Sequence, residues 1–192
     1  MLFIKVVAQH IPYIVRKLIW APDIQRARDK GWDYNGEFVH KDHFLWASKR
    51  IQEASEKGVK ILVGTDNIDS YVYTGSSLHD ELEMLVNTGL TNHTALKSAT
   101  IDAAKFMHED ANYGSVEVGK KADLILLEHN PLEDIKHSDS ICAIFFAGKY
   151  YDQKSIIALK SYSRDMTQSL SVNIQLLFSI FKSPLMRVQF AD

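Results

Sequence analysis

The chain has 192 residues, enough for one ordinary domain and fewer than the ~250 residues of a typical eight-stranded α/β barrel. Hydrophobic residues make up 46% and charged residues 24%, which is close to average globular usage and excludes disorder by composition. The formal charge of -2, without a Lys/Arg cluster interleaved with aromatic residues, excludes the electrostatic pattern of a nucleic-acid-binding protein.

Cysteine content and apolar runs bear on the cellular compartment. The single cysteine, Cys142, cannot form an intrachain disulfide, and it is predicted to be a small buried hydrophobic residue in a reducing cytoplasm. Residues 1–7 are apolar around Lys5 and lack a small-residue cleavage site, so we expect a buried strand and not a signal peptide. The apolar stretch 170–181 is shorter than the ~20 residues of a spanning helix. We therefore expect a cytoplasmic protein without a membrane-spanning segment.

The first third of the chain gives mixed signals. Residues 3–7 and 11–15 predict two short buried strands or one interrupted strand, although Pro12 is unfavourable inside a central ladder. Residues 24–40 are polar and predict a helix fragment followed by a long loop. A helix is then expected from Asp42 to Gly58, because apolar residues recur there at helical spacing.

An apolar run, Val59–Val63, follows that helix at once and predicts a strand ending in the polar turn Gly64-Thr65-Asp66. Beyond this turn, Ser77 and Asp80 predict a capping box at the start of a helix. Helix, strand, polar turn and helix in succession indicate a parallel α/β unit.

Three leucines and a valine recur on the inner face of this helix, which should end at Gly89; they are Leu78, Leu82, Leu85 and Val86. Thr91 predicts the cap of a further helix, and residues 102–107 predict a third short one.

Later segments change to extended runs. Residues 122–128 and 141–147 predict strands, and Ala147-Gly148-Lys149 predicts a tight turn into Tyr150-Tyr151, so a small sheet is expected outside the barrel-like part. Apolar residues at helical spacing from Lys154 to Lys182 predict one long amphipathic helix that Pro184 stops.

Asp66 is the strongest candidate for chemistry. A carboxylate at the C-terminal end of a parallel strand faces the mouth where such folds bind ligands. The alternative is that Asp66 caps the next turn, as aspartate often does.

The chain contains eight histidines, none of them in a His-x-His or His-Glu-x-x-His pattern. His40 and His43 are three residues apart, and we favour a solvated or capping pair over a metal site. His79 lies thirteen residues after Asp66 and either leans over the same mouth, on the substrate side, or bonds to local backbone. His129 and His137 are expected in solvent-exposed loops.

Five segments of the chain follow one another in a specific order: 64–66, 77–91, 95–105, 114–128 and 130–135. In this order they resemble the C-terminal part of the amidohydrolase superfamily, in particular its imidazolonepropionase-like and Xaa-Pro dipeptidase-like members. The resemblance covers residues 1–152 and is strong from Gly58 onward.

The resemblance implies an α/β fold in three parts. Residues 1–115 would be the C-terminal portion of a TIM-like (β/α)8 metal-dependent hydrolase barrel, residues 116–152 part of a small composite β-sandwich, and residues 153–192 a long helix and tail. It further implies hydrolysis of carbon–nitrogen bonds in peptide-like or cyclic amides, with zinc as the divalent metal. Asp66 would be the metal-site aspartate that takes a proton from the attacking water.

The other metal ligands of the superfamily have no counterpart in this sequence. Those ligands are a His-x-His pair, a carboxylated lysine or glutamate, and two further histidines. Catalytic zinc normally has three protein ligands, so we expect this chain alone neither to bind the metal nor to hydrolyse a substrate. We expect a gene fragment, a split gene or a truncated reading frame, whose partner is the missing barrel segment or a second copy.

A non-catalytic interpretation remains open, in which the chain is an interaction or scaffold module that acts through its C-terminal helix. Residues 153–192 contain five Lys/Arg and two Asp, a formal charge of +3, beside an apolar helix face. Such a helix fits an anionic membrane surface or a partner groove. We favour packing of this helix across the barrel wall over a membrane contact.

Overall fold

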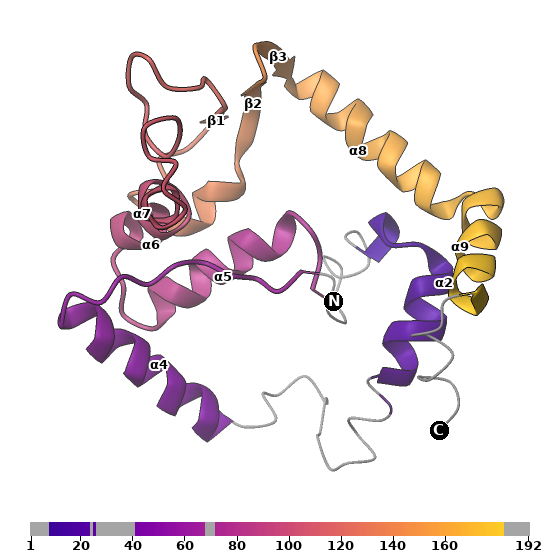
Figure 1. The fold of residues 1–192 in the computed structure, drawn as a ribbon, viewed down its shortest axis with the longest axis horizontal. Helices are drawn as coiled ribbons and strands as arrows, with labels where there is room; N and C mark the ends of the chain where they lie inside the picture. Colours follow the sequence, from indigo (N-terminus) through magenta and orange to yellow (C-terminus); the bar gives the residue numbers. More distant parts are fainter. Residues whose placement is uncertain (1–7, 24, 26–40, 68–71, 183–192) are drawn as a thin grey trace. The chain divides into compact units, whose positions relative to one another are not determined.

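The structure is a computed structural model that describes residues 8–23, 25, 41–67 and 72–182 (Figure 1). The chain divides into two compact units. The mixed unit comprises residues 36–67 and 74–156 and holds both helices and strands. The helical unit comprises residues 1–35, 68–73 and 157–192. The chain is therefore α/β, as predicted, and the division into barrel, sandwich and tail stays a prediction.

Helix α4 opens the mixed unit and spans Lys41–Glu56. It ends as the sequence predicts, because Gly58 adopts a left-handed φ of 82°. The Gly58 N–H donates to the Ser55 carbonyl at 2.9 Å, and the Val59 N–H donates to the Ala54 carbonyl at 3.0 Å. These bonds satisfy carbonyls that the last helical turn leaves without partners.

Three further helices follow in the mixed unit: α5 (Ser76–Asn87), α6 (Asn92–Ser98) and α7 (Ile101–Phe106). The predicted cap of α6 is confirmed, because the Thr94 N–H donates to the Thr91 hydroxyl at 3.1 Å. The predicted capping box of α5 is wrong. Gly75 precedes α5 with a φ of 89°, and no side chain caps the helix.

The core of the mixed unit lies between α5, α6 and the segment before β2. Its buried members are Leu82, Leu85, Leu90, Ala95 and Ile135. Partly buried residues pack around them: Ile51, Ile61, Val63, Leu78, Val86, Leu96 and Ala99. The inner face predicted for α5 is therefore confirmed.

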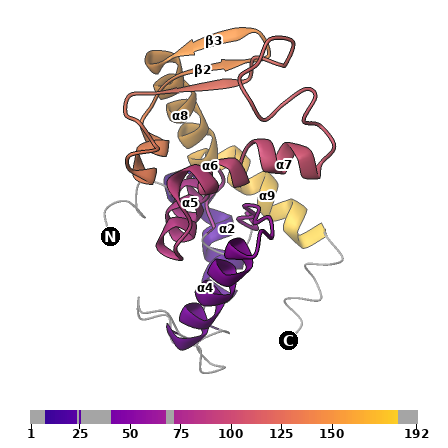
Figure 2. The ribbon, with the colours of Figure 1, turned by 90° about the vertical axis from the view of Figure 1, so that its left-hand side faces the viewer.

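A three-stranded antiparallel sheet follows in the order β1 (Leu124–Leu127), β2 (Ile141–Phe146) and β3 (Lys149–Asp152), with β2 in the centre (Figure 2). The 3-10 helix η3 (Ile135–Asp139) lies between β1 and β2 in sequence. Ala147 and Gly148 have positive φ of 50° and 74°, the signature of a two-residue hairpin turn whose twist matches its strands. The predicted small sheet and its tight turn are confirmed.

The helical unit joins an N-terminal segment to the C-terminal helices. Its elements are η1 (Ala8–His10), α2 (Tyr13–Val15), the π-helical turn η2 (Arg16–Trp20), most of α8 (Gln153–Gln168), and α9 (Leu170–Lys182). The buried Asn173 of α9 links them, because its Oδ1 accepts the Ile14 N–H at 3.1 Å. The Thr167 hydroxyl also donates to the Gln9 carbonyl at 2.8 Å.

Two predicted strands are absent. Residues 59–63 form no ladder, because no described strand lies beside them to exchange hydrogen bonds. Residues 13–15 are helical, with Pro12 just before them at a φ of -53° that suits a helix start. The prediction of a strand at residues 3–7 lies outside the described residues, as does nearly all of the polar stretch 24–40.

The predicted single C-terminal helix is two helices, which break at Ser169. The Asn173 amide donates to the carbonyls of Thr167 and Ser169 at 2.9 and 2.8 Å. Such side-chain bonds to backbone compete with a regular helical ladder, which gives a physical reason for the break. The role predicted for Pro184 lies outside the described residues.

Candidate functional site

Asp66 lies in an exposed turn that follows the irregular segment 59–64 of the mixed unit. Its backbone has a φ of 50°, in the left-handed region that aspartate tolerates better than most side chains. Within the described part of the chain, Asp66 makes no hydrogen bond or ion pair. The Asp66 side chain is exposed at the surface of the mixed unit.

Glu81 of α5 links this turn to the core of the mixed unit through a hydrogen bond. The Gly64 N–H donates to Glu81 Oε1 at 2.7 Å, and Ile61 and Val63 pack against the buried core of the mixed unit. Glu81 Oε2 is buried and has no hydrogen-bond partner among the described residues. One carboxylate oxygen thus holds the turn two residues before Asp66, and the other is desolvated.

Sequence reasoning missed Glu81, although a signal for it exists. Three and four residues separate Glu81 from Leu78 and Leu85, so the carboxylate falls within the apolar face of α5. An acidic residue on such a face needs a partner, because burying a charge without hydrogen bonds is unfavourable.

His79 lies in the first turn of α5 and is half-buried. A hydrogen bond of 3.0 Å joins its Nδ1 to the hydroxyl of Ser138, a buried residue of η3. This contact orients the ring toward η3, and no hydrogen bond joins it to Asp66 among the described residues. A role of His79 on the substrate side stays a prediction.

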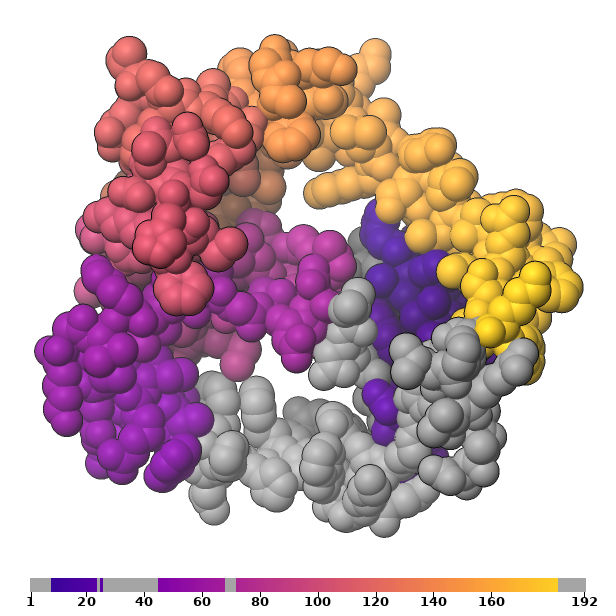
Figure 3. Space-filling view, in the orientation of Figure 1, coloured from indigo at the N-terminus to yellow at the C-terminus, as the bar shows by residue number. Residues whose placement is uncertain are grey.

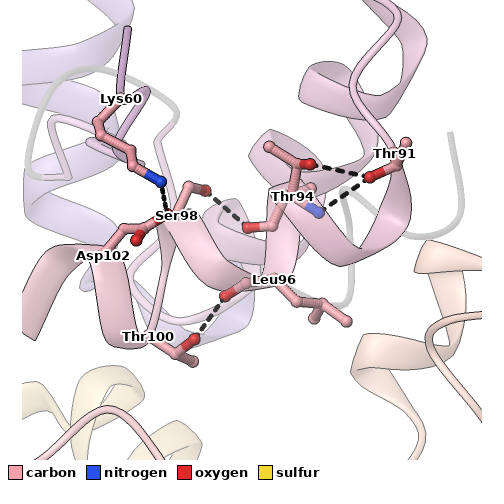
Figure 4. A network of polar contacts seen from close by, with 8 residues as sticks. Lys60, Thr91, Thr94, Leu96, Ser98, Thr100 and Asp102 are labelled. Atoms are coloured by element: carbon pink, nitrogen blue, oxygen red, sulfur yellow. Dashed lines mark hydrogen bonds and ion pairs between the residues drawn. The ribbon is translucent and has the colours of Figure 1, made fainter. Parts of the chain in front are cut away.

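Charged groups lie on α5 and on neighbouring segments of the mixed unit. Partial burial raises the pKa of the Asp80 carboxyl above its ordinary value, His79 opposes that shift, and Glu83 adds to it. Glu83 itself pairs with Lys136 at 3.3 Å. A further ion pair of 3.4 Å joins Lys60, at the start of the irregular segment, to the buried Asp102 of α7 (Figure 4).

No cluster of three or more His, Cys, Asp or Glu side chains that could hold a metal ion occurs in residues 8–23, 25, 41–67 and 72–182. His40 and the side chain of His43 lie outside the described residues. His129 lies in a loop, as predicted, whereas His137 lies in the 3-10 helix η3, so its predicted loop position is wrong. The two rings are 5.1 Å apart, and a hydrogen bond of 3.0 Å joins the Nδ1 of His137 to the Asn130 carbonyl. His129 is exposed, whereas His137 is half-buried.

The helices within the described ranges include none that is long and apolar enough to cross a membrane.

Comparison with known proteins shows a match to one protein family. A model described as the amidohydrolase family matches residues 4–158. Ochratoxinase of Aspergillus niger is 39% identical over 113 residues, which are 53% of this chain and 22% of that protein. Imidazolonepropionase of Fusobacterium nucleatum is 31% identical over 111 residues, covering 52% of this chain and 25% of the relative.

The 5-methylthioadenosine/S-adenosylhomocysteine deaminase of Thermoanaerobacter pseudethanolicus is 27% identical over 117 residues, covering 56% of this chain and 26% of the relative. The chain thus spans about a quarter of the length of the curated relatives that it matches. Among solved structures, a Xaa-Pro dipeptidase with bound methionine is 36% identical, with a TM-score of 0.49 over 55% of this chain and 25% of that one.

Proposed function

Because the chain belongs to the amidohydrolase family, whose model covers residues 4–158, we propose that it forms the C-terminal portion of a hydrolase that acts on carbon–nitrogen bonds. The single observation that carries the proposal is that the family match includes Asp66 and the turn that holds it. Relatives named as deaminases and as an imidazolonepropionase support small-molecule substrates of amide or amidine type.

Asp66 is the proposed catalytic carboxylate. Its exposure, and the absence of a hydrogen-bond or ion-pair partner in the described part of the chain, leave both oxygens available to accept a proton from an attacking water. Glu81 positions it through the Gly64 N–H, and His79 is the proposed neighbour on the substrate side.

The donor set of this chain does not fit a metal site by itself. Asp66 is one carboxylate, whereas catalytic zinc normally takes three protein ligands and an open position, and the described residues gather no such set. We therefore assign no step to a metal. The proposal requires the remaining metal ligands to come from another barrel segment. That segment is the partner that we propose for this chain.

A chimera tests the catalytic proposal. Residues 41–158 would replace the corresponding segment of Aspergillus niger ochratoxinase, of which the match covers 22%, and hydrolysis by that enzyme would be followed. In an active chimera, Asp66→Asn should lower kcat by about 10²- to 10⁴-fold, the contribution typical of a general base. The matched change Asp80→Asn, at an exposed position of α5, should leave kcat within about twofold. An active chimera that keeps its full rate with Asp66→Asn contradicts the proposal.

A second candidate function is an interaction module. The exposed apolar side chains of α8 and α9, most of which lie beyond the family match at residue 158, favour it.

A further inference from the structure

Exposed apolar side chains form a stripe along α9 in the helical unit. Leu170, Ile174, Phe178 and Phe181 recur at i, i+4, i+8 and i+11, and they are between 43% and 76% exposed. With 3.6 residues per turn, this spacing places all four on one face of the helix. A helix of a soluble domain ordinarily buries such a face against a core.

A different face of α9 packs on the rest of the helical unit. Asn173 and Ile180 are its buried residues, and Asn173 bonds to the Ile14 N–H. On a helical wheel these two residues lie about a quarter to a third of a turn from the exposed stripe. α9 therefore carries one face for packing, which holds Asn173 and Ile180, and a second, apolar face that is largely exposed.

α8 repeats the pattern. Leu159, Tyr162 and Met166 recur at i, i+3 and i+7 and are between 42% and 65% exposed, and α8 has no buried residue. Figure 3 draws α8 and α9 in orange to yellow as part of the visible surface. We call these three side chains of α8 and the four of α9 the apolar stripe.

Charge is segregated between the two units. The sequence of the helical unit contains ten Lys/Arg and six Asp/Glu, a formal charge of +4, and that of the mixed unit contains twelve and eighteen, a charge of -6; together they give the -2 of the whole chain. Lys160, Arg164 and Lys182 stand on the same helices as the apolar stripe. Apolar side chains flanked by cations are the pattern of helices that lie in a membrane interface.

We propose that the apolar stripe binds the surface of a lipid bilayer that contains anionic headgroups. The positive charge of the helical unit favours this occupant over a second copy bound stripe to stripe, since that contact would bring two units of +4 together. The family match ends at residue 158, so every residue of the stripe lies outside the region that carries the proposed hydrolase activity. The two proposals are independent.

Sedimentation of the full chain with vesicles tests the inference. We expect binding to vesicles of equal parts phosphatidylcholine and phosphatidylserine, and weaker binding to phosphatidylcholine alone, by about fivefold for each cation at the surface. Phe178→Asp or Ile174→Asp should lower the partition coefficient by more than about tenfold, because each removes a large apolar side chain from the lipid. Gln175→Asp places the same charge on the polar side of α9 and should lower the partition coefficient by about fivefold at most.

Circular dichroism and urea unfolding of each variant should match those of the unmodified chain, so that lost binding is not lost folding. Failure to bind anionic vesicles overturns the proposal, and so does an equal loss with Gln175→Asp. Analytical ultracentrifugation gives the remaining outcome. If the chain self-associates without binding vesicles, and Phe178→Asp makes it monomeric, the stripe is an interface between copies and the proposal fails.

Discussion

Replacing Glu81 by alanine should loosen the turn that carries Asp66. The bond from the Gly64 N–H to Glu81 Oε1 is 2.7 Å long and has a charged acceptor. Hydrogen bonds to charged groups contribute ~1.5–3 kcal/mol, and water competes at this exposed position, so we take the lower end, about 1.5 kcal/mol. That free energy corresponds to a factor of about ten in the opening of the turn.

The effect on global stability should be much smaller. Glu81 Oε2 is buried without a partner, and desolvating an unsatisfied polar atom costs about 1–3 kcal/mol. Glu81→Ala removes this unfavourable contribution together with the favourable bond. Because the two contributions oppose each other, the free energy of unfolding should change by less than about 1 kcal/mol.

Amide hydrogen exchange, followed residue by residue by NMR, separates the local from the global effect. The Gly64 amide should exchange about tenfold faster in Glu81→Ala and about threefold faster in Glu81→Gln, whose neutral acceptor keeps roughly half of the bond strength. Glu83→Ala is the matched control, because Glu83 is on the same helix and pairs with Lys136 instead. The reasoning is refuted if Gly64 exchange is unchanged in Glu81→Ala, or changes equally in Glu83→Ala.

Three further predictions concern stability. Gly114→Ala should destabilise the mixed unit by about 2–5 kcal/mol in urea unfolding, because the φ of Gly114 is +91° and a Cβ would lie 2.8 Å from neighbouring atoms of α7. Gly119 has a similar φ of +94° but open space around it, so Gly119→Ala should lower the free energy of unfolding by only about 1–2 kcal/mol. Equal losses in the two variants would contradict the steric argument. Thr91→Ala should lose about 1 kcal/mol by removing the cap of α6, whereas Thr91→Ser should lose little, and a similar loss from both would show that the hydroxyl is not the cause. The hydroxyl and N–H of Ser155 donate hydrogen bonds to the Asp152 carboxylate and lower its pKa. This contact therefore stabilises the start of α8 at a pH above the ordinary aspartate pKa, and the stabilisation is lost as the pH falls through the lowered pKa. The chemical shift of the Ser155 amide should report that loss on acid titration and should not change over the same pH range in Asp152→Ala.

Local sequence was sufficient for the helices and the hairpin of the mixed unit. The apolar spacing of α5 determines which side of that helix is buried, and Thr91, Gly58 and Gly89 determine where helices begin or end. These features depend on contacts within one or two turns, so the residues themselves carry the information. The order of segments also carried the family resemblance, which the match over residues 4–158 confirms.

Contacts between distant residues were decided only by the tertiary structure. Residues 59–63 are apolar enough for a strand, yet a strand needs a neighbour to exchange hydrogen bonds, and their sequence does not say whether one is present. Likewise, the pairing of Gly64 with Glu81 and of His79 with Ser138 spans 17 and 59 residues. The break at Ser169 depends on Asn173, whose side chain also bonds to Ile14 across the helical unit. Composition and periodicity indicate which residues are buried, whereas the residues that each one contacts depend on long-range contacts of the folded chain.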